Sequence, residues 1–270
     1  MDGTCLYGLR LGLAVGAGIA LQLALVARTK HTRPVWTTTA TTTALFLGLG
    51  GLLEFGSRQP TPETRSLVTG TLALAAVAAV TWFVVRLRTG RPAPATLLIA
   101  VTALLIGREG LEGALYFWSA ARAATGVSAS AQPLLGLALG LAIALLAVWG
   151  LYAGVRRAGP ERTARWTAAA LGVIAAGMLV QGVSALQDAG APGATGSAAQ
   201  PAYDLTATVP PDSWYGTALN GLVHFLPDPT VLQVTVWFLY AVPALLFALA
   251  PIGFGRSVGG AGAKEKTTDG

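Results

Sequence analysis

Long apolar stretches alternate with short polar segments along this chain of 270 residues. A helix that crosses a lipid bilayer needs about 20 consecutive, mostly apolar residues. Seven stretches reach that length, and charged, proline or glycine residues separate each from the next. The stretches are residues 6–27, 35–55, 66–85, 95–120, 133–155, 164–186 and 230–250. The pattern predicts an all-α integral membrane protein with seven transmembrane helices.

The composition agrees with a membrane protein and excludes several other classes. Hydrophobic residues make up 53% of the chain and charged residues 11%, against about 25% charged residues in an average soluble domain. The single cysteine excludes an internal disulfide and a cysteine-rich metal site. The net charge of +6 is spread over short segments between apolar stretches, so we expect the lipid bilayer, and not nucleic acid, as the partner. No nucleotide motif or catalytic-triad spacing occurs, so we do not expect an enzyme.

The distribution of basic residues predicts the orientation in the membrane. Thirteen of the 18 Lys and Arg residues follow the first, third, fifth and seventh stretches, and three follow the others. Cytoplasmic loops carry the excess of Lys and Arg in membrane proteins. We therefore expect a multi-pass protein of the plasma membrane with its N-terminus outside and its C-terminus in the cytoplasm.

This orientation places the long segment after the sixth stretch outside the cell. Residues 189–229 contain three aspartates and no Lys or Arg, and we interpret them as a linker followed by a short surface cap at the membrane interface, without a binding role. His224, alone in that segment, is expected at the surface. Asp188, at its start, is a candidate entrance for cations. We expect a single seven-helix domain over residues 1–255 and a disordered cytoplasmic tail over 256–270.

Three charged residues lie in the middle of the fourth stretch. Arg108, Glu109 and Glu112 fall within five positions, and each ionised side chain at a helix centre costs about 2.5–3.5 kcal/mol on insertion scales. One interpretation is structural: Arg108 pairs with Glu112, one helical turn away, which leaves Glu109 unpaired. The other is functional: Glu109 and Glu112 offer hard oxygen ligands to a cation, and Arg108 offsets their repulsion. Intramembrane charges favour the functional interpretation.

The first stretch carries a partial copy of this motif. Its segment around Arg10 aligns with the segment around Arg108, but Leu11 and Ala14 stand where the second copy has Glu109 and Glu112. An offset of three helices reverses the second copy in the membrane, which predicts an inverted repeat of two three-helix halves, about 6–86 and 95–188, followed by a C-terminal helix. Secondary transporters use such repeats and bind their ions near the midplane.

The Arg-Glu-x-x-Glu motif of the fourth stretch resembles that of the oxidase-dependent iron permeases, the EfeU-like iron transporter family. Further similar segments extend the resemblance over about residues 6–250; they include 53–57, 80–84, 186–190, 203–205, 212–216 and 227–230. The resemblance implies iron transport across the cytoplasmic membrane, with Glu109 and Glu112 as metal ligands and Arg108 and Arg10 as charge-balancing residues. It also implies an oxidase or an extracytoplasmic iron-binding partner.

The first motif departs from the family pattern because both of its carboxylates are absent. Two alternatives to iron transport therefore stay open. In the first, the chain is a diverged, non-transporting subunit of an iron-uptake complex. In the second, it is a permease for another divalent metal. Another copy of the chain would also complete the ligand set in a homo-oligomer. Iron enters these hypotheses as the transported substrate, and no organic cofactor is expected.

Overall fold

The computed structural model describes residues 3–26, 32–56, 61–91, 93–125, 131–157, 160–191 and 195–250. Over these residues the fold is all-α, with one isolated β-bridge between Pro201 and Thr230 and no strand. The elements are α1 (Gly3–Val26), α2 (Thr32–Phe55), α3 (Pro62–Arg88), α4 (Ala95–Thr125), α5 (Gln132–Arg157), α6 (Pro160–Asp188), the 3-10 helix η1 (Ser197–Ala199), α7 (Trp214–Val223) and α8 (Val231–Leu249).

Each of the seven apolar stretches coincides with one long helix. Three segments of the described chain are long and apolar enough to cross a membrane, namely Pro62–Arg88, Arg165–Asp188 and Val231–Leu249. The all-α class is thereby confirmed, whereas the crossing by all seven helices stays a prediction. The predicted tail, residues 256–270, lies outside the described residues.

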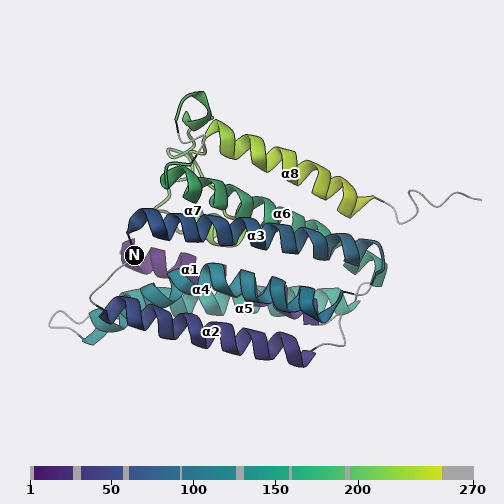
Figure 1. The fold of residues 1–270 in the computed structure, drawn as a ribbon, viewed down its shortest axis with the longest axis horizontal. Coiled ribbons are helices and arrows are strands. Elements are labelled where there is room, and N and C mark those ends of the chain that lie inside the picture. Colours follow the sequence, from purple (N-terminus) through teal and green to yellow (C-terminus); the bar gives the residue numbers. More distant parts are fainter. Residues whose placement is uncertain are drawn as a thin grey trace, which may run out of the picture.

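The long helices run side by side, and consecutive ones point in alternating directions (Figure 1). The start of α1, the end of α2, the start of α3 and the segment between α6 and α8 gather at one end of the bundle. The end of α3, the start of α4 and the end of α8 lie at the other. We call the first of these the N-terminal end of the bundle.

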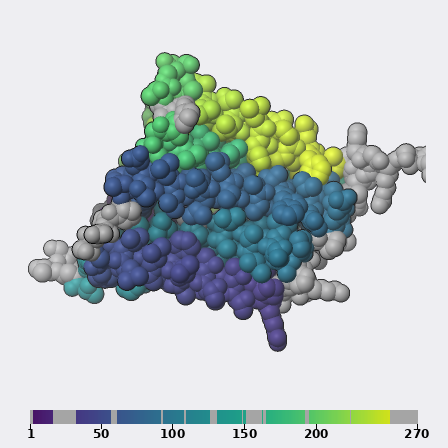
Figure 2. Space-filling view, viewed as in Figure 1, coloured from purple at the N-terminus to yellow at the C-terminus, as the bar shows by residue number. Residues whose placement is uncertain are grey.

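The helices pack mainly in pairs. The most extensive contacts join α1 with α5, α3 with α6, and α2 with α4, and α8 covers α6. In the space-filling view α3 runs across the exposed face between α8 and α2 (Figure 2). The pairs α1–α5 and α4–α2 correspond to each other if the first three helices match the next three, but the inverted repeat itself stays a prediction.

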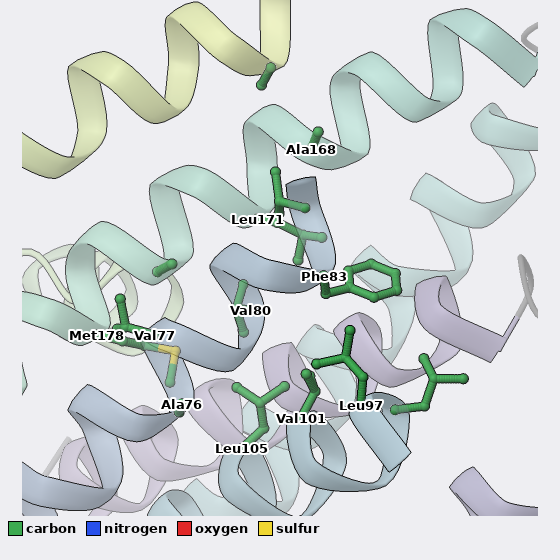
Figure 3. Close-up of a cluster of buried hydrophobic side chains, with 14 of the residues drawn as sticks. Ala76, Val77, Val80, Phe83, Leu97, Val101, Leu105, Ala168, Leu171 and Met178 are labelled. Atoms are coloured by element: carbon green, nitrogen blue, oxygen red, sulfur yellow. The ribbon is translucent and has the colours of Figure 1, made fainter. Parts of the chain in front are cut away.

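One buried apolar cluster holds α3, α4 and α6 together. Val80 and Phe83 from α3, Leu97 and Val101 from α4, and Leu171 from α6 meet there (Figure 3). Large apolar side chains are also exposed on the outer faces of the bundle; Leu52, Leu139, Ile143, Leu146, Trp149, Leu239 and Leu246 are examples. Exposed apolar surface on this scale is typical of helices that contact lipid or a partner, which agrees with a membrane protein.

The segment between α6 and α8 does not form a separate surface cap. The side chain of Ser213 accepts a hydrogen bond from the Gly216 backbone and begins α7, and α7 packs against α1. A Cβ atom at Gly221 would lie only 2.8 Å from the Arg10 carbonyl oxygen, so only glycine permits this approach. The expectation that this segment merely covers the surface is wrong, because part of it reaches the side of α1 midway along the bundle.

Candidate ion site

Glu109 lies near the middle of α4 and faces a histidine from residues 189–229, which we call the outer segment. Its Oε1 atom is 3.6 Å from Nε2 of His224, and the two side chains are 16% and 6% exposed. His224 therefore lies in the interior of the bundle, and its predicted surface position is wrong. Glu109 is therefore not left without a partner, as the structural alternative assumed, whereas the pairing of Arg108 with Glu112 stays a prediction. A lone histidine in a polar segment gives no periodic signal, so the sequence could not reveal this contact.

Glu112, one turn further along α4, pairs with a residue of α1. Its Oε2 atom is 3.9 Å from a terminal nitrogen of Arg10, and the two side chains are 28% and 34% exposed. The guanidinium of Arg10 also lies 4.9 Å from the centre of the Tyr7 ring. Arg10 thus lies at ion-pair distance from a carboxylate of the second motif, and its role as a charge-balancing residue stays a prediction. The side chain of Arg108 lies outside the described part of the structure.

The two carboxylates line different cavities. Glu112 lines a polar cavity of about 270 Å³ at the N-terminal end of the bundle, together with Tyr7, Leu53, Glu54, Arg65, Leu115, Tyr116 and Ser119. Glu109 lines an apolar cavity of about 280 Å³ between α1, α2, α4 and α5. Thr39 and Thr43 are the hydroxyl-bearing residues among those that line this second cavity. The two carboxylates of this α4 turn therefore border two different cavities.

Glu54 belongs to the polar cavity and was not among the predicted site residues. Its side chain is 17% exposed and lies 3.5 Å from Arg122, which also donates a hydrogen bond to the Glu54 carbonyl oxygen. Its position near the end of an apolar stretch suits an interfacial group equally well. Only the meeting of α2 with α4 brings Glu54 into the same cavity as Glu112.

The first-motif positions that lack carboxylates are closed by packing. Leu11 is 1% exposed and Ala14 is 9% exposed. A Cβ atom at Gly12 would collide with the carbonyl oxygen of Leu137, so α1 and α5 touch backbone to backbone. The first half therefore offers no carboxylate at these positions.

The described residues contain no preformed group of three or more His, Cys, Asp or Glu side chains that could hold a metal ion. Each of the three carboxylates here lies near a basic partner: Glu109 near His224, Glu112 near Arg10 and Glu54 near Arg122. Asp188, the candidate entrance, is exposed at the C-terminal end of α6 and lines neither cavity. Its role as an entrance for cations stays a prediction.

The segment between α6 and α8 contains a further acidic group, Asp204, which is exposed. The backbone N–H and hydroxyl of Thr206 both donate to Oδ1 of Asp204, at 2.8 and 2.6 Å. These hydrogen bonds favour the charged carboxylate and lower the pKa of Asp204 below its usual value. Asp204 therefore keeps its negative charge through the physiological range of pH.

Comparison with known proteins agrees with the resemblance seen in the sequence. The profile of the Iron permease FTR1 family matches residues 3–259. The chain is 29% identical over 265 residues to the proteins named Ferrous iron permease EfeU from Shigella sonnei (strain Ss046) and Escherichia coli O157:H7, covering 90% of this chain and 94% of each relative. A relative from Escherichia coli (strain K12), with the same identity and coverage, is named Putative inactive ferrous iron permease EfeU. No solved structure matches the chain.

Proposed function

Since the chain belongs to the Iron permease FTR1 family, we propose that it transports iron ions across the plasma membrane through the helix bundle. The related permeases named for ferrous iron support this proposal. In this proposal seven helices, α1 to α6 and α8, cross the membrane with the N-terminus outside. The family points to a transporter and not to an enzyme. We also propose that the chain acts with an oxidase or an extracytoplasmic iron-binding partner and that it forms a homo-oligomer.

Glu109 and Glu112 are the ligands that the ion meets in the middle of the bundle. The observation that carries this assignment is their position on one turn of α4, each open to a different cavity. Carboxylate oxygens suit hard and borderline cations, and a charge at a helix centre is costly unless it serves such a role. Arg10 holds Glu112 until the ion displaces it, and Arg108 balances the charge of the turn.

In this proposal the ion passes through the two cavities in turn. An ion attracted by Asp188 and the acidic outer segment enters the polar cavity, where Glu54 and Glu112 meet it. It passes to Glu109 and then to the cavity with the Thr39 and Thr43 hydroxyls. Each step exchanges a few oxygen ligands for others, so binding stays weak enough for release, as conduction requires.

The second candidate function is a non-transporting subunit of an iron-uptake complex. The buried Leu11 and Ala14 favour it, because the first half supplies no carboxylate there. Transport of another divalent metal is a variant of the main proposal, since carboxylates alone discriminate weakly among such ions.

Uptake by the purified chain separates these candidates. We expect proteoliposomes that contain the chain alone to accumulate Fe²⁺ faster than empty vesicles under anaerobic conditions. Parallel uptake of Mn²⁺ and Zn²⁺ would identify a permease of broader range. Uptake equal to that of empty vesicles for all three ions would favour the non-transporting subunit.

The proposed orientation has its own test. Reporter domains fused after Arg33, Arg91 and Arg162 should be cytoplasmic, and one fused after Ser197 should be external. An external reporter at any of the first three positions would contradict the crossing by seven helices.

A further inference from the structure

The position of His224 results from two features of the chain. Gly221 allows α7 to lie against the Arg10 backbone. Asn220 then holds the following turn, because its carbonyl oxygen accepts from the His224 N–H at 2.9 Å and its side-chain amide donates to the Phe225 carbonyl at 3.0 Å. The imidazole is thereby placed beside Glu109 in the interior.

The backbone of His224 is in the left-handed region, with φ 59° and ψ 35°. Among the described residues it alone has a positive φ without being glycine. Helices commonly end at such a position with glycine, which avoids the steric cost of a Cβ atom. Strained backbone of this kind clusters at functional sites, so the choice of histidine here points to a use for its side chain.

The separation of the two groups fits a shared metal ion. At 3.6 Å, the Nε2 and Oε1 atoms are too far apart for a hydrogen bond. Two ligand atoms that each lie about 2.1 Å from one ion are about 3.4 Å apart at the tetrahedral angle and about 3.0 Å apart at a right angle. An ion between His224 and Glu109 would therefore need only a small adjustment of either side chain.

We propose that His224 is a metal ligand of the ion pathway and acts together with Glu109. This inference rests on the proposed function and specifies its substrate class. Imidazole nitrogen binds borderline divalent ions such as Fe²⁺ well, whereas Mg²⁺, Ca²⁺ and Mn²⁺ prefer oxygen ligands. A site of one imidazole and one carboxylate, completed by water, selects Fe²⁺ over Mn²⁺. The outer segment thus sets the selectivity of a site that the helices alone would build from oxygen.

The chain offers a matched pair of variants because it contains two histidines, His31 and His224. His224→Asn keeps a residue that tolerates the left-handed backbone and removes the imidazole. His31→Asn is the control. Untagged full-length protein in detergent, kept anaerobic, would be titrated with Fe²⁺ and with Mn²⁺, and pulsed paramagnetic resonance of bound Mn²⁺ would detect nitrogen ligands.

We expect His224→Asn to weaken Fe²⁺ binding by about tenfold or more, since loss of a group that only hydrogen-bonds to a metal ligand already costs about 10–100-fold in affinity. We expect it to weaken Mn²⁺ binding by much less. The nitrogen coupling should vanish in this variant and persist in His31→Asn. An unchanged Fe²⁺ preference in His224→Asn, or a nitrogen signal that persists there, would overturn the assignment.

Two further outcomes are also decisive. If His224→Asn unfolds, His224→Gly suits the same backbone; loss of folding in both variants would identify the imidazole as a structural group and overturn its role as a ligand. If the wild-type chain binds neither ion, the proposed function fails along with this inference. If it binds Fe²⁺ and His224→Asn binds it equally well, only this inference fails.

Discussion

The segments around Arg10 and around Glu109 align in sequence but lie in different surroundings. Leu11 and Ala14 of the first segment are 1% and 9% exposed. Glu109 and Glu112 occupy the aligned positions of the second segment, with 16% and 28% of their side chains exposed, and both line cavities. The carboxylates thus occur at the helix centre that borders a cavity, and the apolar side chains occur at the aligned positions that neighbouring helices cover.

The glycines of the two segments show how the packing differs. Gly12 of α1 faces the backbone of α5, where a Cβ atom would collide with Leu137, whereas Gly110 of α4 faces the side chain of Phe46 at 3.3 Å. A side chain can shift by a few tenths of an ångström to make room, whereas a packed helix backbone can do so only if the whole helix moves. The first segment is therefore rigidly held, and the second has room to adjust around an ion.

The largest expected effect comes from placing a carboxylate in the closed segment. Leu11→Glu would bury a charge among apolar groups, and we expect it to lower the free energy of unfolding by about 3 kcal/mol or more. The volume-conserving control Leu11→Met should cost less than about 1.5 kcal/mol. Thermal unfolding in detergent measures both. An unchanged melting temperature for Leu11→Glu, with increased metal affinity, would show that the first segment still has room for an ion.

A pair of glycine substitutions probes the packing itself. Gly12→Ala should destabilise the protein by about 1–3 kcal/mol, because α1 must move away from α5. Gly110→Ala should be close to neutral, since a slight movement of Phe46 is offset by about 1 kcal/mol of helix propensity. Equal losses of stability in the two variants would contradict the difference between the segments.

The smallest expected effect concerns Arg10 and Glu112, which connect the two segments. Their separation of 3.9 Å and partial exposure are typical of ion pairs that contribute about 0.2–1 kcal/mol. A double-mutant cycle with Arg10→Gln and Glu112→Gln, followed by thermal unfolding, would measure this coupling. A coupling several times larger would indicate that the pair holds the bundle together and is not a displaceable partner of the ion.

Much of the fold is predictable from the sequence because its signals are local. The apolar stretch 35–55 ends at the same residue as α2, and the stretch 230–250 begins at Thr230, whose side chain accepts from the Gln233 backbone to start α8. Such boundaries follow from hydropathy and capping residues that stand next to each other in the chain.

The site is only partly predictable because its contacts are long-range. Glu109 and Glu112 stand out as charges within an apolar stretch, and Arg10 stands out by its alignment with Arg108. The contact of His224 with Glu109 depends on the approach of α7 to α1, and the place of Glu54 beside Glu112 depends on the packing of α2 against α4. The spacing of hydrophobic residues along the chain does not indicate that α7 packs against α1 or that α2 packs against α4.

The most direct test of iron transport through the second segment is the initial rate of Fe²⁺ uptake by Glu109→Gln in proteoliposomes. Glu63→Gln provides the control, since Glu63 is an exposed carboxylate in the first turn of α3. A neutral amide keeps the shape of the side chain but is a poorer ligand for a cation. We therefore predict that Glu109→Gln loses uptake by about tenfold or more at an unchanged melting temperature, whereas Glu63→Gln transports like the wild type. Uptake by Glu109→Gln at the wild-type rate would contradict the account.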